Sequence, residues 1–247
     1  MSVLVIQHLE PERPCGIAAS LAAVGLEVEL VRTDLGHGVP ATVEGRSGLV
    51  VLGGPMSAMS DIDFPTRTSE VAILADALER GVPVLGVCLG AQLLAVAAGG
   101  RVRPGNGPEI GWAPVDLIDQ PAPDPLFGGL GPSLVVLHWH GETYDLPPDA
   151  VQLAASASYE QQAFRMGAVA WGLQFHLEVD RPAVERFVEA FPDDAARAPG
   201  GAARILGDTE SALASDPEKR ALVLDRFSRI CRLRTSTGAV AHGHGGS

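Results

Sequence analysis

The sequence has little cysteine and few basic residues. Its three cysteines, Cys15, Cys88 and Cys231, are far apart and odd in number. This argues against a disulfide framework and against a Cys-x-x-Cys metal site. Lysine and arginine total 18 against 30 acidic residues, which gives a formal net charge of -12. No basic stripe stands out, so we expect no nucleic-acid partner.

Long apolar runs are also lacking. No run approaches the roughly 20 residues that a membrane-spanning helix needs. The first apolar run, Val3–Ile6, has no charged segment before it and is too short for a signal peptide. We therefore expect a cytoplasmic protein with no membrane partner. Hydrophobic residues make up 46% of the chain, enough for the core of one large α/β domain.

Short apolar runs alternate with helical patterns through the first hundred residues. The expected strands are Val3–Gln7, Glu27–Val31, Leu49–Leu52 and Val82–Val87, and the expected helices are Cys15–Val24, Thr66–Arg80 and Leu89–Ala98. This alternation predicts an α/β fold with a doubly wound, mostly parallel sheet and helices on both faces. Sites in such folds gather at the carboxyl ends of the strands.

The pattern changes after Gly99. Glycine and proline punctuate residues 99–131, where we expect turns and short antiparallel strands. Further β-like runs are Val135–Trp139, Val151–Ala155, Gln162–Arg165 and Val169–Phe175, and later helical patterns cover Pro182–Phe191, an alanine-rich middle and Glu218–Leu233. We predict a domain over residues 1–180, a helical extension over 181–234 that packs on the same domain, and a flexible tail over 235–247.

The stretch Val84–Gln92 reads as an apolar strand, a tight turn with one cysteine, and the start of a helix. Small residues on both sides of Cys88 let the backbone turn sharply, as in a nucleophile elbow, so that the side chain stands at the carboxyl edge of the sheet. The positive end of the following helix favours a thiolate at this position. A Gly-x-Cys-x-Gly pattern needs a base and an oxyanion site elsewhere to indicate catalysis.

Residues 173–178 supply a candidate base. Alternation along an extended strand would place Gln174, His176 and Glu178 on one side. Glu178 could then bond one nitrogen of His176 and leave the other for Cys88. An isolated histidine is more often a core or surface residue, but the His-x-Glu pattern and the elbow together favour a dyad.

An oxyanion site would need two amides. By analogy with other elbows, the amide of Leu89 supplies one. Gly54 follows an expected strand and could supply the second. Taken alone, the Gly53-Gly54-Pro55 segment would be an ordinary turn.

Several motifs occur in the order found in one family. They are Gly53-Gly54-Pro55-Met56-Ser57, Gly86-Val87-Cys88-Leu89-Gly90-Ala91-Gln92, Glu109-Ile110-Gly111-Trp112, His140-Gly141-Glu142 and Gly172-Leu173-Gln174-Phe175-His176-Leu177-Glu178. The chain resembles the triad-type class I glutamine amidotransferases, nearest the glutaminase domain of GMP synthase and its stand-alone relatives. The resemblance spans about residues 1–179.

The resemblance implies a role for each matching position. Cys88 would attack the side-chain amide carbon of glutamine, His176 would protonate the departing ammonia and later activate water, and Glu178 would orient His176. The oxyanion would be held by the amides of Gly54 and Leu89, and substrate contacts would come from Gln92, Trp139 and His140. The resemblance implies no cofactor and no metal.

Two positions depart from the usual family pattern. Leu177 replaces the usual proline, and Glu142 replaces the usual aspartate. Leu177 should not disturb the dyad, because its side chain faces away. The residues after Glu178 are too few and too helical for a second catalytic domain, so an ammonia-accepting synthetase or transferase would act in trans.

Two other functions stay open. A γ-glutamyl peptidase or hydrolase would use the same triad with another leaving group. A regulatory subunit could keep the fold without catalysis. Outside the triad, Cys15 and Cys231 are interpreted as small buried residues. His138 and His140 would suggest a metal pair if a carboxylate accompanied them, but the resemblance accounts for this segment as pocket wall.

Overall fold

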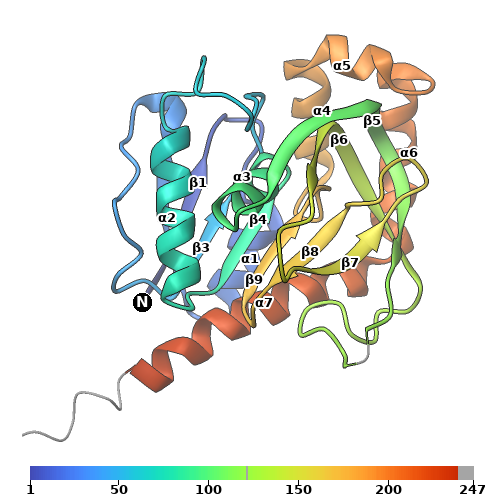
Figure 1. Cartoon of the computed structure of the whole chain (residues 1–247). Helices are drawn as coiled ribbons and strands as arrows, with labels where there is room; N and C mark the ends of the chain where they lie inside the picture. Colours follow the sequence, from blue (N-terminus) through green and yellow to red (C-terminus); the bar gives the residue numbers. More distant parts are fainter. Residues whose placement is uncertain (121, 239–247) are drawn as a thin grey trace, which may run out of the picture.

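The computed structural model describes residues 1–120 and 122–238. Within them the strands form one nine-stranded sheet in the order β2-β1-β3-β4-β9-β8-β7-β5-β6 (Figure 1). The strands are β1 (Ser2–Gln7), β2 (Glu27–Arg32), β3 (Gly48–Val51), β4 (Val84–Val87), β5 (Arg101–Leu117), β6 (Ser133–Asp145), β7 (Val151–Ala155), β8 (Ala163–Met166) and β9 (Ala170–Leu173). The helices are α1 (Cys15–Ala23), α2 (Arg67–Glu79), α3 (Leu89–Ala97), α4 (Arg181–Ala190), α5 (Pro192–Arg197), α6 (Gly201–Ser215) and α7 (Pro217–Gly238), with a 3-10 turn, η1, at Thr33–Leu35.

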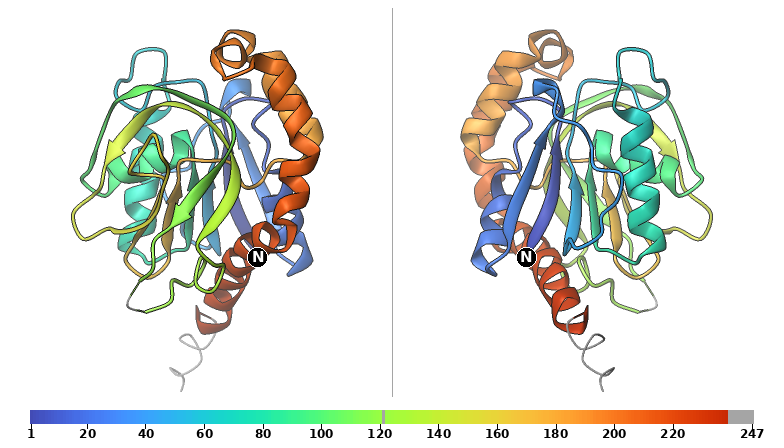
Figure 2. Two further views of the ribbon diagram at one scale, coloured as in Figure 1. Left: turned by 90° about the vertical axis from the view of Figure 1, so that its right-hand side faces the viewer. Right: turned by 90° about the vertical axis from the view of Figure 1, so that its left-hand side faces the viewer.

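The strands β2, β1, β3, β4 and β9 are parallel. Alternate residues along each strand point to opposite faces. Val5, Val50 and Leu85 face α1 and α7, whereas Leu4 and Leu49 face α2 and α3. Both faces are covered (Figure 2), which explains why these strands are short and almost entirely apolar. The predicted doubly wound α/β fold is confirmed.

The other half of the sheet is antiparallel. Here β8, β7, β5 and β6 continue the sheet from β9. Over residues 99–131 we expected turns and short antiparallel strands. The antiparallel pairing is confirmed, but the expectation of turns and short strands was wrong for Arg101–Leu117, which is a single strand of 17 residues. Pairing with β6 overrides the local turn preference, and a register shift between Pro104 and Glu109 accommodates the glycines and prolines.

The C-terminal helices pack on both the sheet and α1. In Figure 2, α4, α5 and α6 lie on the opposite side of the molecule from α2, and α7 crosses below the sheet. Arg220 of α7 donates to the carbonyls of Leu177 and Val179, at 3.0 Å each, and lies over the ring of Trp112. The start of the extension at residue 181 stays a prediction.

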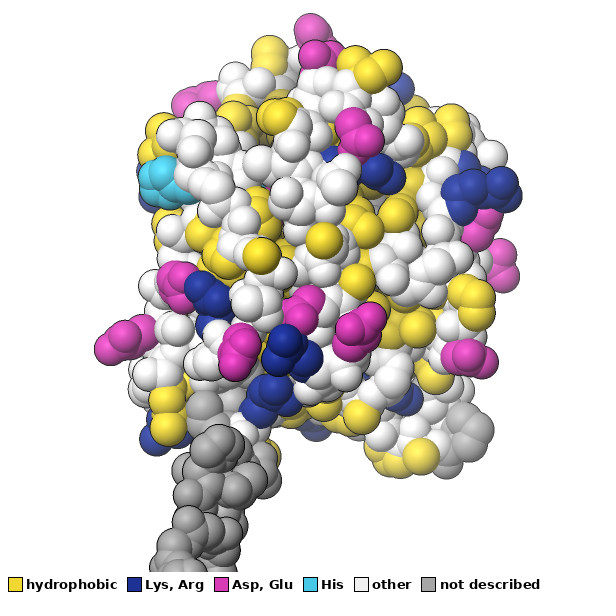
Figure 3. Space-filling model, turned by 60° about the vertical axis from the view of Figure 1, so that its left-hand side comes forward, with side chains coloured by type: hydrophobic (Ala, Val, Ile, Leu, Met, Phe, Trp, Pro, Cys, Tyr) yellow, Lys and Arg dark blue, Asp and Glu magenta, His cyan; other side chains and the backbone are white. Residues whose placement is uncertain are grey.

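The described part of α7 reaches Gly238, so residues 235–238 of the expected tail are helical. The rest of that segment, 239–247, lies outside the described residues. None of the described helices has the length and apolar character that a membrane span requires. On the face drawn in Figure 3, acidic and basic side chains are interspersed.

Candidate active site

Cys88 occupies a sharp turn between β4 and α3. Its φ of 52° and ψ of -107° are rare for a residue with a side chain. The neighbouring glycines leave room for this turn. A Cβ on Gly90 would overlap the carbonyl oxygen of Val51, and one on Gly86 would lie 2.5 Å from the carbonyl oxygen of Gly90. The local sequence therefore has the close packing that a nucleophile elbow requires.

The Cys88 side chain is 8% exposed and opens into a pocket. Its sulfur lies 3.7 Å from the carbonyl oxygen of Trp139 and 3.8 Å from Nε2 of Gln174. Gln174 also accepts a hydrogen bond from Nε2 of Gln92 at 3.2 Å. Two side-chain amides thus connect the turn of the elbow with the first turn of α3.

His176 follows β9 rather than lying within it, because β9 ends at Leu173. Backbone bonds to Leu137 of β6 hold it in place. Its Nδ1 lies 2.7 Å from Oε1 of Glu178, and both side chains are buried. Burial lowers the pKa of His176, but the negative charge of Glu178 and the hydrogen bond with Cys88 raise it well above its usual value. The structure therefore places Cys88 and His176 on the wall of one pocket, with Glu178 bonded to the Nδ1 side of the imidazole.

Gly54 lies beside the start of α3. A Cβ on Gly54 would lie 2.8 Å from Cδ2 of Leu89, so the two predicted oxyanion amides come from adjoining segments. The preceding carbonyl, of Gly53, lies 2.8 Å from Nδ1 of His8. His8 Nε2 in turn lies 2.7 Å from Oε2 of Glu70, and both residues are buried. Burial lowers the pKa of His8, but the hydrogen bond and charge of Glu70 raise it overall.

This arrangement fixes the peptide between Gly53 and Gly54. In a trans peptide the carbonyl and the following N–H point in opposite directions, and the described chain has no cis peptide bonds. The Gly54 N–H therefore points away from His8.

The pocket at Cys88 has a volume of about 240 Å³. Gln92, Trp139 and His140, which were predicted as substrate contacts, all line it. The C-terminal helices complete the wall. The segment of α4 and α5 contributes Phe187, Phe191, Asp194 and Arg197.

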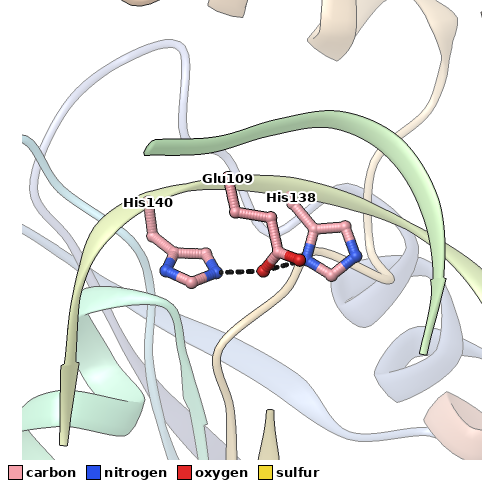
Figure 4. Close-up of side chains that lie close together, drawn as sticks. All are labelled: Glu109, His138 and His140. Carbon is pink, nitrogen blue, oxygen red and sulfur yellow. Dashed lines mark hydrogen bonds and ion pairs between the residues drawn. The ribbon is translucent and has the colours of Figure 1, made fainter. Parts of the chain in front are cut away.

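The partly buried carboxylate of Glu109 lies between His138 and His140 (Figure 4). Oε2 of Glu109 is 3.2 Å from Nδ1 of His138 and 3.0 Å from Nε2 of His140. Glu109 was not predicted from the sequence as a neighbour of this pair. The three residues offer ligand atoms within 4.8 Å of one another, a spacing that a metal ion could use.

Hydrogen-bond donors already surround this carboxylate. His140 and Gln162 hydrogen-bond to Oε2, at 3.0 and 2.5 Å, and Ser156 donates to Oε1 at 2.7 Å. Nδ1 of His138 lies 3.2 Å from Oε2, but neither ring nitrogen of His138 makes a hydrogen bond with the described residues. Burial raises the pKa of Glu109, but the two neighbouring histidines and the hydroxyl of Ser156 lower it overall. The carboxylate is therefore stabilised by protein donors, and the cluster joins β5 to the pocket wall.

Sequence reasoning missed several polar residues around the site. Glu12 lines the pocket, and His8 and Glu70 hold the Gly53 carbonyl. Gln174 was placed on the correct side but given no role. His8 and Glu12 follow a buried strand at its carboxyl end, which was an available signal. Glu70 is in a helix and had none.

Comparisons with known proteins agree on one family. The family model for class-I glutamine amidotransferases matches residues 16–188. A glutamine amidotransferase-like protein of Salmonella typhimurium is 31% identical over 180 residues, covering 71% of this chain and 75% of that protein. One subunit of the glutamine-hydrolyzing GMP synthase of Sulfolobus acidocaldarius is 32% identical over 178 residues, covering 71% of this chain and 87% of that protein.

Longer relatives and solved structures extend this result. A GMP synthase of Thermomicrobium roseum is 41% identical over 133 residues, covering 53% of this chain and 23% of that protein. A glutamine amidotransferase structure from Thermotoga maritima superposes with a TM-score of 0.82 at 31% identity, covering 94% of this chain and 98% of the other. One from Methylobacillus flagellatus gives 0.84 at 31%, covering 93% and 94%. The chain belongs to the class-I glutamine amidotransferase family.

Proposed function

We propose that this protein hydrolyses the side-chain amide of glutamine through a γ-glutamyl thioester on Cys88, releasing glutamate and ammonia. The observation that carries the proposal is that Cys88 and His176 line one pocket, with His176 held by Glu178 through a hydrogen bond at Nδ1. A thiolate beside an imidazolium is the activated nucleophile of Cys-His acyl-transfer sites.

In the first half-reaction the Cys88 sulfur forms a bond to the amide carbon. The carbonyl oxygen becomes an oxyanion, for which the amides of Gly54 and Leu89 are the proposed donors. His176 gives its proton to the nitrogen as the C–N bond breaks, and ammonia leaves. Glu178 stabilises the imidazolium and fixes its tautomer through Nδ1.

In the second half-reaction His176 is neutral and removes a proton from water. Hydroxide adds to the thioester carbon, the C–S bond breaks, and glutamate leaves. We assign the amino-acid end of the substrate to Gln92, Trp139 and His140, which line the pocket on the side of α3 and β6.

The ammonia would pass to a separate acceptor enzyme. Support comes from the similarity to proteins named as subunits of GMP synthase.

A second candidate function is γ-glutamyl hydrolysis with a larger leaving group. It is favoured by Phe191, Asp194 and Arg197, which line the pocket from a region that the family model does not cover. A regulatory, non-catalytic role is the remaining alternative, and the presence of all three triad residues argues against it.

The test is glutamate release from glutamine by purified protein, with C88A as control and with candidate synthetases added in turn. We expect release by the unaltered protein and none by C88A. No release under any of these conditions would contradict the proposal.

A further inference from the structure

Glu12 is a buried carboxyl in the pocket wall that the proposed reaction does not use. It is 7% exposed and lies in the loop between β1 and α1. No described residue hydrogen-bonds to its carboxyl or forms an ion pair with it within 4.0 Å, and the positive charges that act on it come from His176 and His8. A buried carboxyl without a partner is costly, so a residue of this kind in a pocket indicates a polar or charged ligand.

The position of Glu12 indicates which part of the substrate it would contact. A side-chain carbon at Gly53 would overlap Oε2 of Glu12 and lie 3.2 Å from Cε1 of His176. The carboxyl and the imidazole edge therefore flank the same point. Since His176 must reach the departing nitrogen to protonate it, this is the leaving-group side of the pocket.

The neighbouring wall is apolar and aromatic. The Phe187 ring lies edge-on to His176, with 5.1 Å between ring centroids, and borders the same pocket. The other charged residues that line the pocket include the acidic Glu142 and Asp194 and the basic Arg197. A carboxylate beside an aromatic wall suits a cation carried on a short aliphatic chain.

We propose that Glu12 and Phe187 form a leaving-group subsite for a cationic amine, so that the protein prefers γ-glutamyl amides whose amine carries a second, positively charged nitrogen. This inference rests on the proposed thioester reaction and specifies the leaving group of the second candidate function, γ-glutamyl hydrolysis. The covalent steps are unchanged: the amide C–N bond breaks, the Cys88 thioester forms, and the proton of His176 goes to the departing amine. Burial raises the pKa of Glu12 to about 7, so the carboxylate is the main form at pH 8.

The experiment compares three substrates at pH 8: glutamine, the neutral γ-glutamyl propylamide, and the γ-glutamyl amide of 1,3-diaminopropane. We expect kcat/KM for the diamine amide to exceed that for the propylamide at least tenfold. Glu12→Gln should remove this preference, so that the ratio of kcat/KM for the diamine amide to that for the propylamide falls to about one. Glu10→Gln, an exposed residue of the same loop, is the matched control and should keep the preference.

Binding to C88A provides an arm that needs no turnover. Calorimetry should give a tighter Kd for the diamine amide than for the propylamide, and the difference should vanish in C88A with Glu12→Gln. Equal affinities, or an equal loss for all three substrates in Glu12→Gln, would overturn the inference. Absence of turnover together with the expected binding difference would contradict the proposed reaction but support the subsite. Thermal unfolding of each variant verifies that it is folded.

Discussion

The Glu178 carboxylate lies 2.7 Å from Nδ1 of His176, although one residue separates them in the chain. Arg220 donates to the backbone carbonyls of both neighbours of Glu178, and a backbone bridge joins His176 to Leu137, so this short segment is held from two sides. The dyad is thus supported by β6 and by the C-terminal helix α7.

This relationship predicts the effect of Glu178→Gln on pH dependence. Because Glu178 raises the pKa of His176, its loss should lower that pKa. Thioester hydrolysis needs neutral His176, so the acidic limb of the kcat profile should move to lower pH. We also expect kcat to fall on the order of 10²-fold, since the tautomer is no longer fixed.

The measurement is kcat for glutamate release between pH 5 and 9. Glu189→Gln, an exposed glutamate of α4, is the control. A limb that stays in place in Glu178→Gln would show that the pair does not set the protonation of His176.

The His8–Glu70 pair predicts a loss of rate without a loss of substrate binding. His8→Ala frees the Gly53 carbonyl, so the Gly54 amide is no longer held in one direction. We expect kcat to fall about tenfold to 10²-fold, less than the loss of an oxyanion donor itself, while KM changes little. Glu70→Gln should have a smaller effect in the same direction.

Steady-state kinetics with glutamine checks this prediction, with His37→Ala as an exposed histidine control. A rise in KM at constant kcat would instead place His8 in substrate binding.

Glu109 is predicted to act through hydrogen bonds. Glu109→Gln removes the negative charge between His138 and His140 and replaces one carboxylate oxygen with an NH₂ group that cannot accept a hydrogen bond. We therefore expect a several-fold rise in KM and a loss of about 1–3 kcal/mol in the free energy of unfolding. EDTA should leave glutamate release unchanged, since protein donors already neutralise this carboxylate.

Kinetics and urea unfolding measure both effects, with the exposed Glu160→Gln as control. Inactivation by EDTA that added zinc reverses would contradict this account and assign the cluster to a metal.

Much of the fold followed from the sequence because its signals are local. Apolar runs such as Leu49–Leu52 and glycine-flanked turns such as Gly86–Gly90 specify strands and the elbow through sterics of nearby residues. The strand Arg101–Leu117 did not follow from local signals, because it depends on pairing with β6 and its own composition is rich in glycine.

The part of the site that depends on residues close together in the sequence was also predictable. His176 and Glu178 are neighbours in sequence, so alternation alone suggested their contact. Glu12, His8 and Glu70 depend on the packing of α2 and the β1–α1 loop around Gly53, which no local pattern encodes.

Glu12 should also make stability depend on pH. Burial raises its pKa from 4.5 to about 7, with opposition from the nearby charges of His176 and His8 and support from Glu178. The folded state therefore binds the proton more tightly than the unfolded state. This contribution is full below about pH 4.5 and is lost as pH rises to about 7.

Glu12→Gln should remove the loss of stability that accompanies ionisation of this carboxyl at high pH. We expect the variant to be more stable than the unaltered protein at pH 8, by about 3 kcal/mol at most, and similar at pH 5. Urea unfolding at the two pH values tests this. Lower stability of Glu12→Gln at pH 8 would mean that the carboxylate has a stabilising partner.

The most direct test of the central claim is to locate the covalent intermediate. A glutamine analogue with an electrophilic carbon at the amide position should add once per chain, on Cys88, as measured by intact mass and peptide mapping. Burial raises the pKa of Cys15 to about 12 and also raises that of Cys231, so neither should compete. We expect a single adduct on Cys88 that free glutamine prevents and that C88A lacks. An adduct on Cys15 or Cys231, or none on Cys88, would contradict the central claim.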